Sequence, residues 1–177
     1  MAAVTHRVTS TDAGNTPNTS GAFSPASGDL LVVIVTKEAS ALSSPMASAD
    51  LTSSVAPTGF TLIRNQGHRS NTAHMGIFVA DALTTNTTSR TVTIASGADA
   101  GAGTNISVFS VSGMTKVGAT AVRGQGGENN AVPGSTPVPA FGAAELTTNP
   151  CIGAIYNQAN PAAVTEPSGW SEGSDTG

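Results

Sequence analysis

The chain has 177 residues, of which only 10% are charged and 4% aromatic, and its formal net charge is -4. Seven Lys and Arg in an acidic chain form no basic stripe for neutralising phosphates, which argues against a nucleic-acid partner. No window approaches the 18 or more apolar residues of a membrane span. The N-terminus also lacks a basic region followed by an apolar one, so we expect neither insertion nor a secretion signal.

The longest apolar run is Leu-Leu-Val-Val-Ile-Val, which follows Gly-Asp in residues 28–35. It is too short for a membrane span and too rich in β-branched residues for a helix, so it predicts a central strand covered on both faces. In a sandwich we expect Leu30, Val32 and Ile34 to face the core and the alternate set, Leu31, Val33 and Val35, to face outward. Such an outward row needs a cover. Residues 38–56 and a neighbouring subunit are the two candidates.

Further strands are expected on both sides of this run, and residues 90–94 give the clearest pattern. There Val92 and Ile94 point inward and the threonines outward. Residues 11–21, 65–72, 84–89 and 96–104 read as polar loops or turns. The other predicted strands are 3–10, 60–64, 74–82, 105–111, 117–122 and 151–156.

No stretch of ten residues has the apolar spacing of a helix. Many short strands instead predict an all-β fold, an antiparallel two-sheet sandwich of jelly-roll type with long irregular loops. We expect residues 1–25 to form an N-terminal arm or edge strand. Residues 26–177 would then form a single domain with an irregular arm at 123–141.

A short pattern, an apolar strand followed by a Pro-x-Gly-aromatic turn, occurs twice in the chain. The first copy is residues 30–35 with 57–60, and the second is residues 151–156 with 167–170. The first copy continues into two more strands, whereas the second stops at Gly177. Two explanations remain open. The chain is a fragment of a longer protein, or a partner closes the sheet edge that the second copy leaves exposed.

The candidate metal ligands are His6, His68 and His74, of which the last two flank one predicted hairpin. No cysteine or carboxylate cluster accompanies them at ligand spacing, so we expect surface or strand-edge histidines and no metal site. Cys151, the one cysteine, lies among apolar residues and is expected to be an inert core thiol.

The sequence shows no recognisable motif for a nucleophile, a phosphate-binding loop or a pair of catalytic carboxylates. No Ser lies in Gly-x-Ser-x-Gly, and residues 124–127 lack the helix and Lys of a phosphate loop. Trp170 and Tyr156 would suit a sugar-stacking platform, but packing over the end of the sandwich is expected for Trp170. The carboxylates at predicted strand ends are expected to be solvated rather than a glycosidase pair: Asp29, Glu38, Asp81 and Glu145. We predict no enzyme, no catalytic residue and no cofactor.

Several segments in a fixed order resemble a group of jelly-roll proteins common in the structural modules of tailed phages and prophages. In that group GDLL opens one strand and PxGF or PxGW opens the next. The segments that carry the resemblance are residues 27–35, 56–63, 75–82, 90–94, 106–113 and 167–170. Members of the group continue for two more strands after the second such turn, whereas this sequence does not.

The resemblance implies a non-enzymatic virion protein, most naturally a capsid decoration (cement) protein that stabilises the shell. Its partners would be the major capsid protein and copies of itself in a homotrimer, assembled in the bacterial host cytoplasm. Residues 1–25 and 123–141 are expected to touch these neighbours. The alternative is a carbohydrate-binding module or the receptor-binding part of a phage tail, which would bind a glycan.

Overall fold

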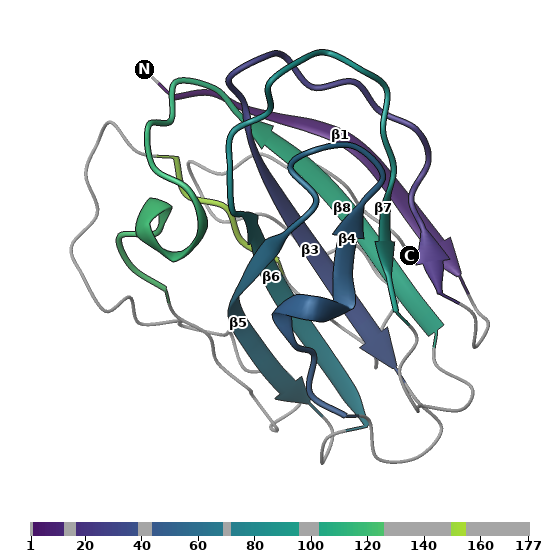
Figure 1. Ribbon diagram of the computed structural model, residues 1–177. Helices are drawn as coiled ribbons and strands as arrows, with labels where there is room; N and C mark the ends of the chain where they lie inside the picture. Colours follow the sequence, from purple (N-terminus) through teal and green to yellow (C-terminus); the bar gives the residue numbers. More distant parts are fainter. Residues whose placement is uncertain are drawn as a thin grey trace.

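The computed structural model of the protein describes residues 2–12, 17–38, 44–68, 72–95, 103–125 and 150–154. Within these ranges the chain forms β-strands and two short 3-10 helices, and none of them contains an α-helix (Figure 1). Nor does any helix there have the length and apolarity to cross a bilayer. The elements are β1 (Val4–Asp12), β2 (Asn18–Thr19), β3 (Leu30–Glu38), η1 (Ser48–Asp50), β4 (Leu51–Ser53), β5 (Phe60–His68), β6 (Ala73–Ala80), β7 (Val92–Ile94), β8 (Gly103–Val111) and η2 (Gly118–Ala121).

The strands form two antiparallel sheets. Sheet A has five strands in the order β1-β8-β3-β6-β5, and sheet B has three in the order β2-β7-β4. Figure 1 shows β4 and β7 in front of the larger sheet. The predicted all-β sandwich of two antiparallel sheets is therefore confirmed, with the run after Gly28 as its middle strand.

The face of β3 that meets sheet B is the one carrying Leu31, Val33 and Val35. Val35 pairs with Gly76 of β6, so the two residues lie on the same face of sheet A. A Cβ added at Gly76 would lie 2.9 Å from Cε of Met46, a residue that comes shortly before strand β4 of sheet B in the chain. The sequence prediction had these two faces reversed. Because both sets of side chains on this strand are apolar, the alternation carries no signal for which set meets the second sheet.

Residues 44–53 provide the predicted cover over the row of Leu31, Val33 and Val35. They contribute β4, and their side chains Met46 and Leu51 are buried in the same apolar cluster as β3. The segment 38–56 was thus the correct candidate. It covers the row because it supplies a strand of the second sheet, which buries apolar side chains between two layers about 10 Å apart.

The opposite face of sheet A is also buried at its centre, where Val32 is 7% exposed and its neighbour Val79 is 3% exposed. Part of the cover comes from η2. A Cβ on Gly118 would lie 3.2 Å from Oγ1 of Thr61, and Thr61 pairs with Val79 on this face. Apolar side chains after β8 pack against the core as well, namely Met114, Val117, Ala121, Val122, Ile152 and Ala154.

The short elements depart most from the sequence prediction. Strand β2 lies in residues 11–21, which were predicted as a loop, and β4 lies in residues 38–56, which were predicted only as a cover. Their two and three residues show no apolar alternation that the sequence analysis could detect. Residues 117–122 were predicted as a strand but contain η2, where Gly118 has a φ of 52°, outside the range of extended chain. β5 runs to His68, beyond the predicted end at residue 64.

Candidate functional site

The three histidines lie in different settings. His6 on β1 packs against Phe109, with 5.3 Å between ring centroids, and its Nε2 lies 2.9 Å from Oγ1 of Thr9. His74 is buried between the sheets, on β6, which is not an edge strand of sheet A, so the prediction of a surface or strand-edge position is wrong for it. His68 is the last residue of β5 and pairs with Ala73. Within the described ranges no three His, Cys, Asp or Glu gather to hold a metal ion.

The predicted solvated carboxylates divide into two kinds. Asp29 is buried, and its Oδ2 accepts hydrogen bonds from Nη2 of Arg7 at 3.1 Å and from the backbone N–H of Ala26 at 3.0 Å. It was predicted as solvated because it lies at the end of a predicted strand, where charges are usually solvated. The local sequence carries no signal for the ion pair with Arg7. Asp81 is exposed as expected and accepts a hydrogen bond from Thr61. Glu38 is half-buried at the end of β3, and Glu145 lies outside the described residues.

Cys151 is exposed, contrary to the predicted core position, and residues 151–154 form no strand. Its apolar neighbours predicted a buried strand, but Ile152 and Ala154 pack on the core from an irregular segment. Several predicted features lie outside the described residues: residues 155 and 156 of that strand, the Trp170 platform, the predicted arm beyond residue 125, and the Gly pair at 126–127.

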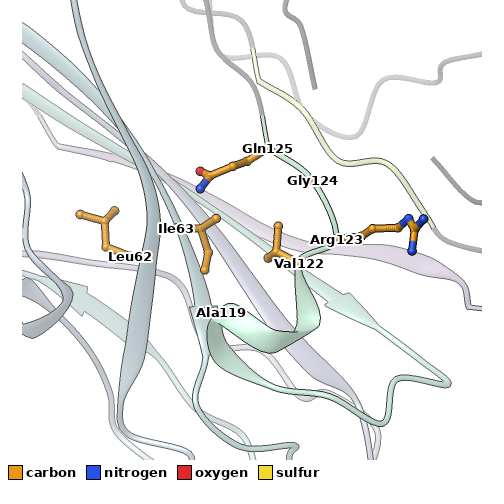
Figure 2. A pocket seen from close by; sticks show the side chains of 7 residues that line it. All are labelled: Leu62, Ile63, Ala119, Val122, Arg123, Gly124 and Gln125. Carbon is orange, nitrogen blue, oxygen red and sulfur yellow. The ribbon is translucent and has the colours of Figure 1, made fainter. Parts of the chain in front are cut away.

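A cleft of about 330 Å³ lies beside the edge strand β5. A bulge makes Ile63 an extra residue of this strand, between Leu62 and Arg64. Figure 2 shows the side chains of Ile63, Val122 and Gln125 converging on one space, with Leu62 on the far side of the strand. Ligand pockets start at about 300 Å³. This cleft therefore has room for a small apolar group that contacts the side-chain amide of Gln125. The remaining lining residues are Ala119, Arg123 and Gly124.

A row of polar side chains closes one end of the core between the sheets. Lys37 pairs with His74 on one side and with Thr104 on the other, and each of these three is at most 5% exposed. Nδ2 of Asn18 donates to the backbone oxygen of Thr104 at 3.1 Å. The sequence analysis missed this row. Its one signal was that Lys37 continues the spacing of Leu31, Val33 and Val35, the set assigned to the outer face.

Arg90 is a second buried cation, 1% exposed at the start of the β7 segment. Its guanidinium donates to the backbone oxygens of Ala56 at 2.7 Å and Asn86 at 3.2 Å, and also to Oδ1 of Asn86 and the oxygen of Thr88. Desolvation by burial lowers the pKa of Arg90, but a guanidinium stays protonated in proteins. The fifth N–H, on Nη1, reaches the backbone oxygen of Val55 at 3.5 Å. The side chain therefore ties two loops together, and each of its five N–H groups has an acceptor.

The outer side of sheet B carries a regular array of hydroxyl groups, called here the threonine face. Thr93 on the middle strand pairs with Thr19 on one side and Thr52 on the other, and the Oγ1 atoms of Thr19 and Thr93 lie 2.9 Å apart. One step along the strands, the backbone N–H of Thr91 donates to Oγ of Ser54 at 3.0 Å. Thr19, Thr52 and Ser54 are exposed, whereas Thr91 and Thr93 on the middle strand are half-buried.

Among these features the threonine face combines access with regular geometry, whereas the polar row and Arg90 are buried. It offers hydroxyl donors and acceptors at fixed positions, which suits binding through surface contact. Comparison with known proteins adds no relative, because no family model, curated protein or solved structure matches the chain.

Proposed function

We propose that the two sheets form a jelly roll. In that fold eight strands pair in nested fashion, first with eighth, second with seventh and third with sixth. The pairs β1 with β8, β2 with β7 and β3 with β6 follow this rule. The fourth pair departs from it, since β5 joins β6 in sheet A. Two hydrogen bonds still link the β4 region of sheet B to the β5 region of sheet A. The backbone N–H of Ser53 donates to the backbone oxygen of Thr58 at 3.3 Å, and the backbone N–H of Leu62 donates to Oγ of Ser48 at 2.8 Å.

We further propose that the protein is a non-enzymatic virion component, a capsid decoration protein of a tailed phage. The observation that carries this proposal is the nested strand pairing, because double-sheet jelly rolls recur in viral capsid proteins. A fold by itself does not assign a function. The segments GDLL at 28–31 and PTGF at 57–60 narrow the class through their resemblance to tailed-phage structural modules.

In this proposal the partners are the major capsid protein and further copies of the chain, arranged as a homotrimer. The protein would be assembled onto the virion in the cytoplasm of the bacterial host. Contact with neighbours is the whole activity, so the relevant quantity is affinity for the shell. Specific interfaces of this kind bury about 1,200–2,000 Å² in total.

Co-sedimentation tests the proposal. The purified chain is mixed at micromolar concentration with shells assembled from the major capsid protein encoded in the same genome. We expect saturable binding at a fixed ratio to shell subunits, and a trimer mass by light scattering. A chain that stays in the supernatant as a monomer, or a genome without a capsid gene, would refute it. Binding to a glycan array that is lost in Trp170→Ala would favour the lectin type of jelly roll instead.

A further inference from the structure

Lys37 and Lys116 are the lysines of the chain, and they lie in opposite settings. Lys37 is 4% exposed and lies on the inner face of sheet A, whereas Lys116 is exposed. Burial of an ammonium group costs free energy even where the group is paired, because it loses its water. The burial of Lys37 therefore calls for an explanation, and the groups around it indicate one.

Asn18 faces Lys37 from the other sheet. It is 4% exposed and pairs with Ile94, which is completely buried on the inner side of sheet B. Nδ2 of Asn18 donates to the backbone oxygen of Thr104 at 3.1 Å, and Thr104 is the partner of Lys37 on the adjacent strand β8. Stacked sheets lie about 10 Å apart, which is roughly the span of a lysine and an asparagine side chain joined end to end. An extended Lys37 side chain that leans across Thr104 therefore reaches the carboxamide carbon of Asn18.

Asp12 and Thr104 add the groups that a reaction between these two side chains needs. Asp12 on β1 pairs with Thr104, so its half-buried carboxyl group lies on the same inner face. A carboxyl group in this position transfers a proton from an attacking amine to a leaving nitrogen. Oγ1 of Thr104 is buried and has no hydrogen-bond partner among the described residues, which is rare for a hydroxyl group in a folded protein. It belongs to the residue that already holds the carboxamide of Asn18, so it is placed to donate to an oxyanion formed there.

We propose that Lys37 and Asn18 form an intramolecular isopeptide bond that joins sheet A to sheet B. Asp12 takes one proton from the ammonium group of Lys37, and the amine then attacks Cγ of Asn18. The hydroxyl of Thr104 donates to the oxyanion that forms. Asp12 passes its proton to Nδ2, the Cγ–Nδ2 bond breaks, and ammonia leaves with a second proton of Nζ as an ammonium ion. The product is an amide between Nζ and Cγ, and no oxidant, reductant or further reactant takes part.

The bond stabilises the sandwich in two ways. The amide carries no charge, so the folded protein no longer has to bury an ammonium group. A cross-link between residues 18 and 37 also closes a loop of chain across the two layers and restricts the unfolded state, as a disulfide does. The one N–H that remains on Nζ takes the place of Nδ2, whose acceptor is the backbone oxygen of Thr104. This inference goes beyond the proposed function and does not depend on it.

Mass spectrometry of the denatured chain tests the bond. Loss of ammonia lowers the mass of the intact chain by about 17 Da relative to its sequence. Trypsin cleaves after a free lysine but not after one whose Nζ is acylated. The linked chain should therefore give a single tryptic peptide of residues 8–64 that lacks ammonia, in place of separate peptides 8–37 and 38–64.

Three variants and one control assign the atoms. Lys37→Met removes the nucleophile, Asn18→Ala removes the electrophile, and both should have the full mass of their sequences. Asp12→Asn should lose ammonia roughly 100-fold more slowly, since it cannot carry the proton. Lys116→Met is the matched control at the exposed lysine and should lose ammonia like the unsubstituted chain.

A full mass for the unsubstituted chain after prolonged incubation at neutral pH would overturn the proposal. Loss of ammonia with normal cleavage after Lys37 would overturn it as well, because that result indicates an asparagine that has cyclised on its own backbone. Loss of ammonia at the native rate in Asp12→Asn would show that Asp12 is not the proton carrier. Folding of each variant is checked by circular dichroism, and the peptide map of the unsubstituted chain decides the question even where a variant does not fold.

Discussion

Replacing Arg90 tests whether a buried guanidinium holds one end of the sandwich together. Arg90→Met keeps much of the side-chain volume but removes every donor that now reaches Ala56, Asn86 and Thr88. Hydrogen bonds from a charged donor contribute about 1.5–3 kcal/mol each. Water replaces part of that loss at the loop carbonyls, and Met needs no desolvation of a charge. We therefore expect the free energy of unfolding to fall by about 3 kcal/mol, less than the sum of the bonds.

Urea denaturation followed by circular dichroism measures this change. With a slope of about 2 kcal/mol per molar urea, a loss of about 3 kcal/mol lowers the midpoint by roughly 1.5 M. Lys116→Met is the control, because Lys116 is exposed and its replacement should leave the midpoint unchanged. An Arg90→Met midpoint equal to that of the unmodified protein would show that the loops keep their positions without the guanidinium, and the reasoning would be wrong.

Three further predictions concern the core, a turn and the cysteine. Phe78→Ala should lower the free energy of unfolding by about 3–5 kcal/mol in the same urea assay, because Phe78 is completely buried between the sheets; a loss under 1 kcal/mol would contradict that position. Gly118→Ala should cost about 1–2 kcal/mol, since φ is 52° and the new Cβ would lie 3.2 Å from Asp81; an unchanged midpoint would argue against η2. Cys151 should react with Ellman's reagent in the native protein at a rate close to that of the urea-unfolded chain, and strong protection would restore the predicted core position.

The strands with a strong hydrophobic pattern were predictable, whatever their length. Val92 and Ile94 alternate with threonines, and both are completely buried, with the threonines turned outward as expected. The run from Leu30 to Val35 was correctly placed at the centre of the fold. It could not reveal its own orientation, since an apolar residue at every position looks the same from either face.

The rest depended on contacts between distant parts of the chain. Asp29 is buried because Arg7 reaches it from another strand, and no local pattern records that pair. Lys37 and His74 meet because β3 and β6 are in register, which a single sequence does not specify. The threonine face likewise needs the pairing of three strands, two of which are too short to predict, although the outward threonines of residues 91 and 93 were visible from the start.

Electron cryo-microscopy of the chain bound to the capsid shells would test the central claim most directly. The account predicts density for the protein, as a trimer, at every equivalent shell position. Shells that show no added density at saturating concentrations of the chain would contradict it.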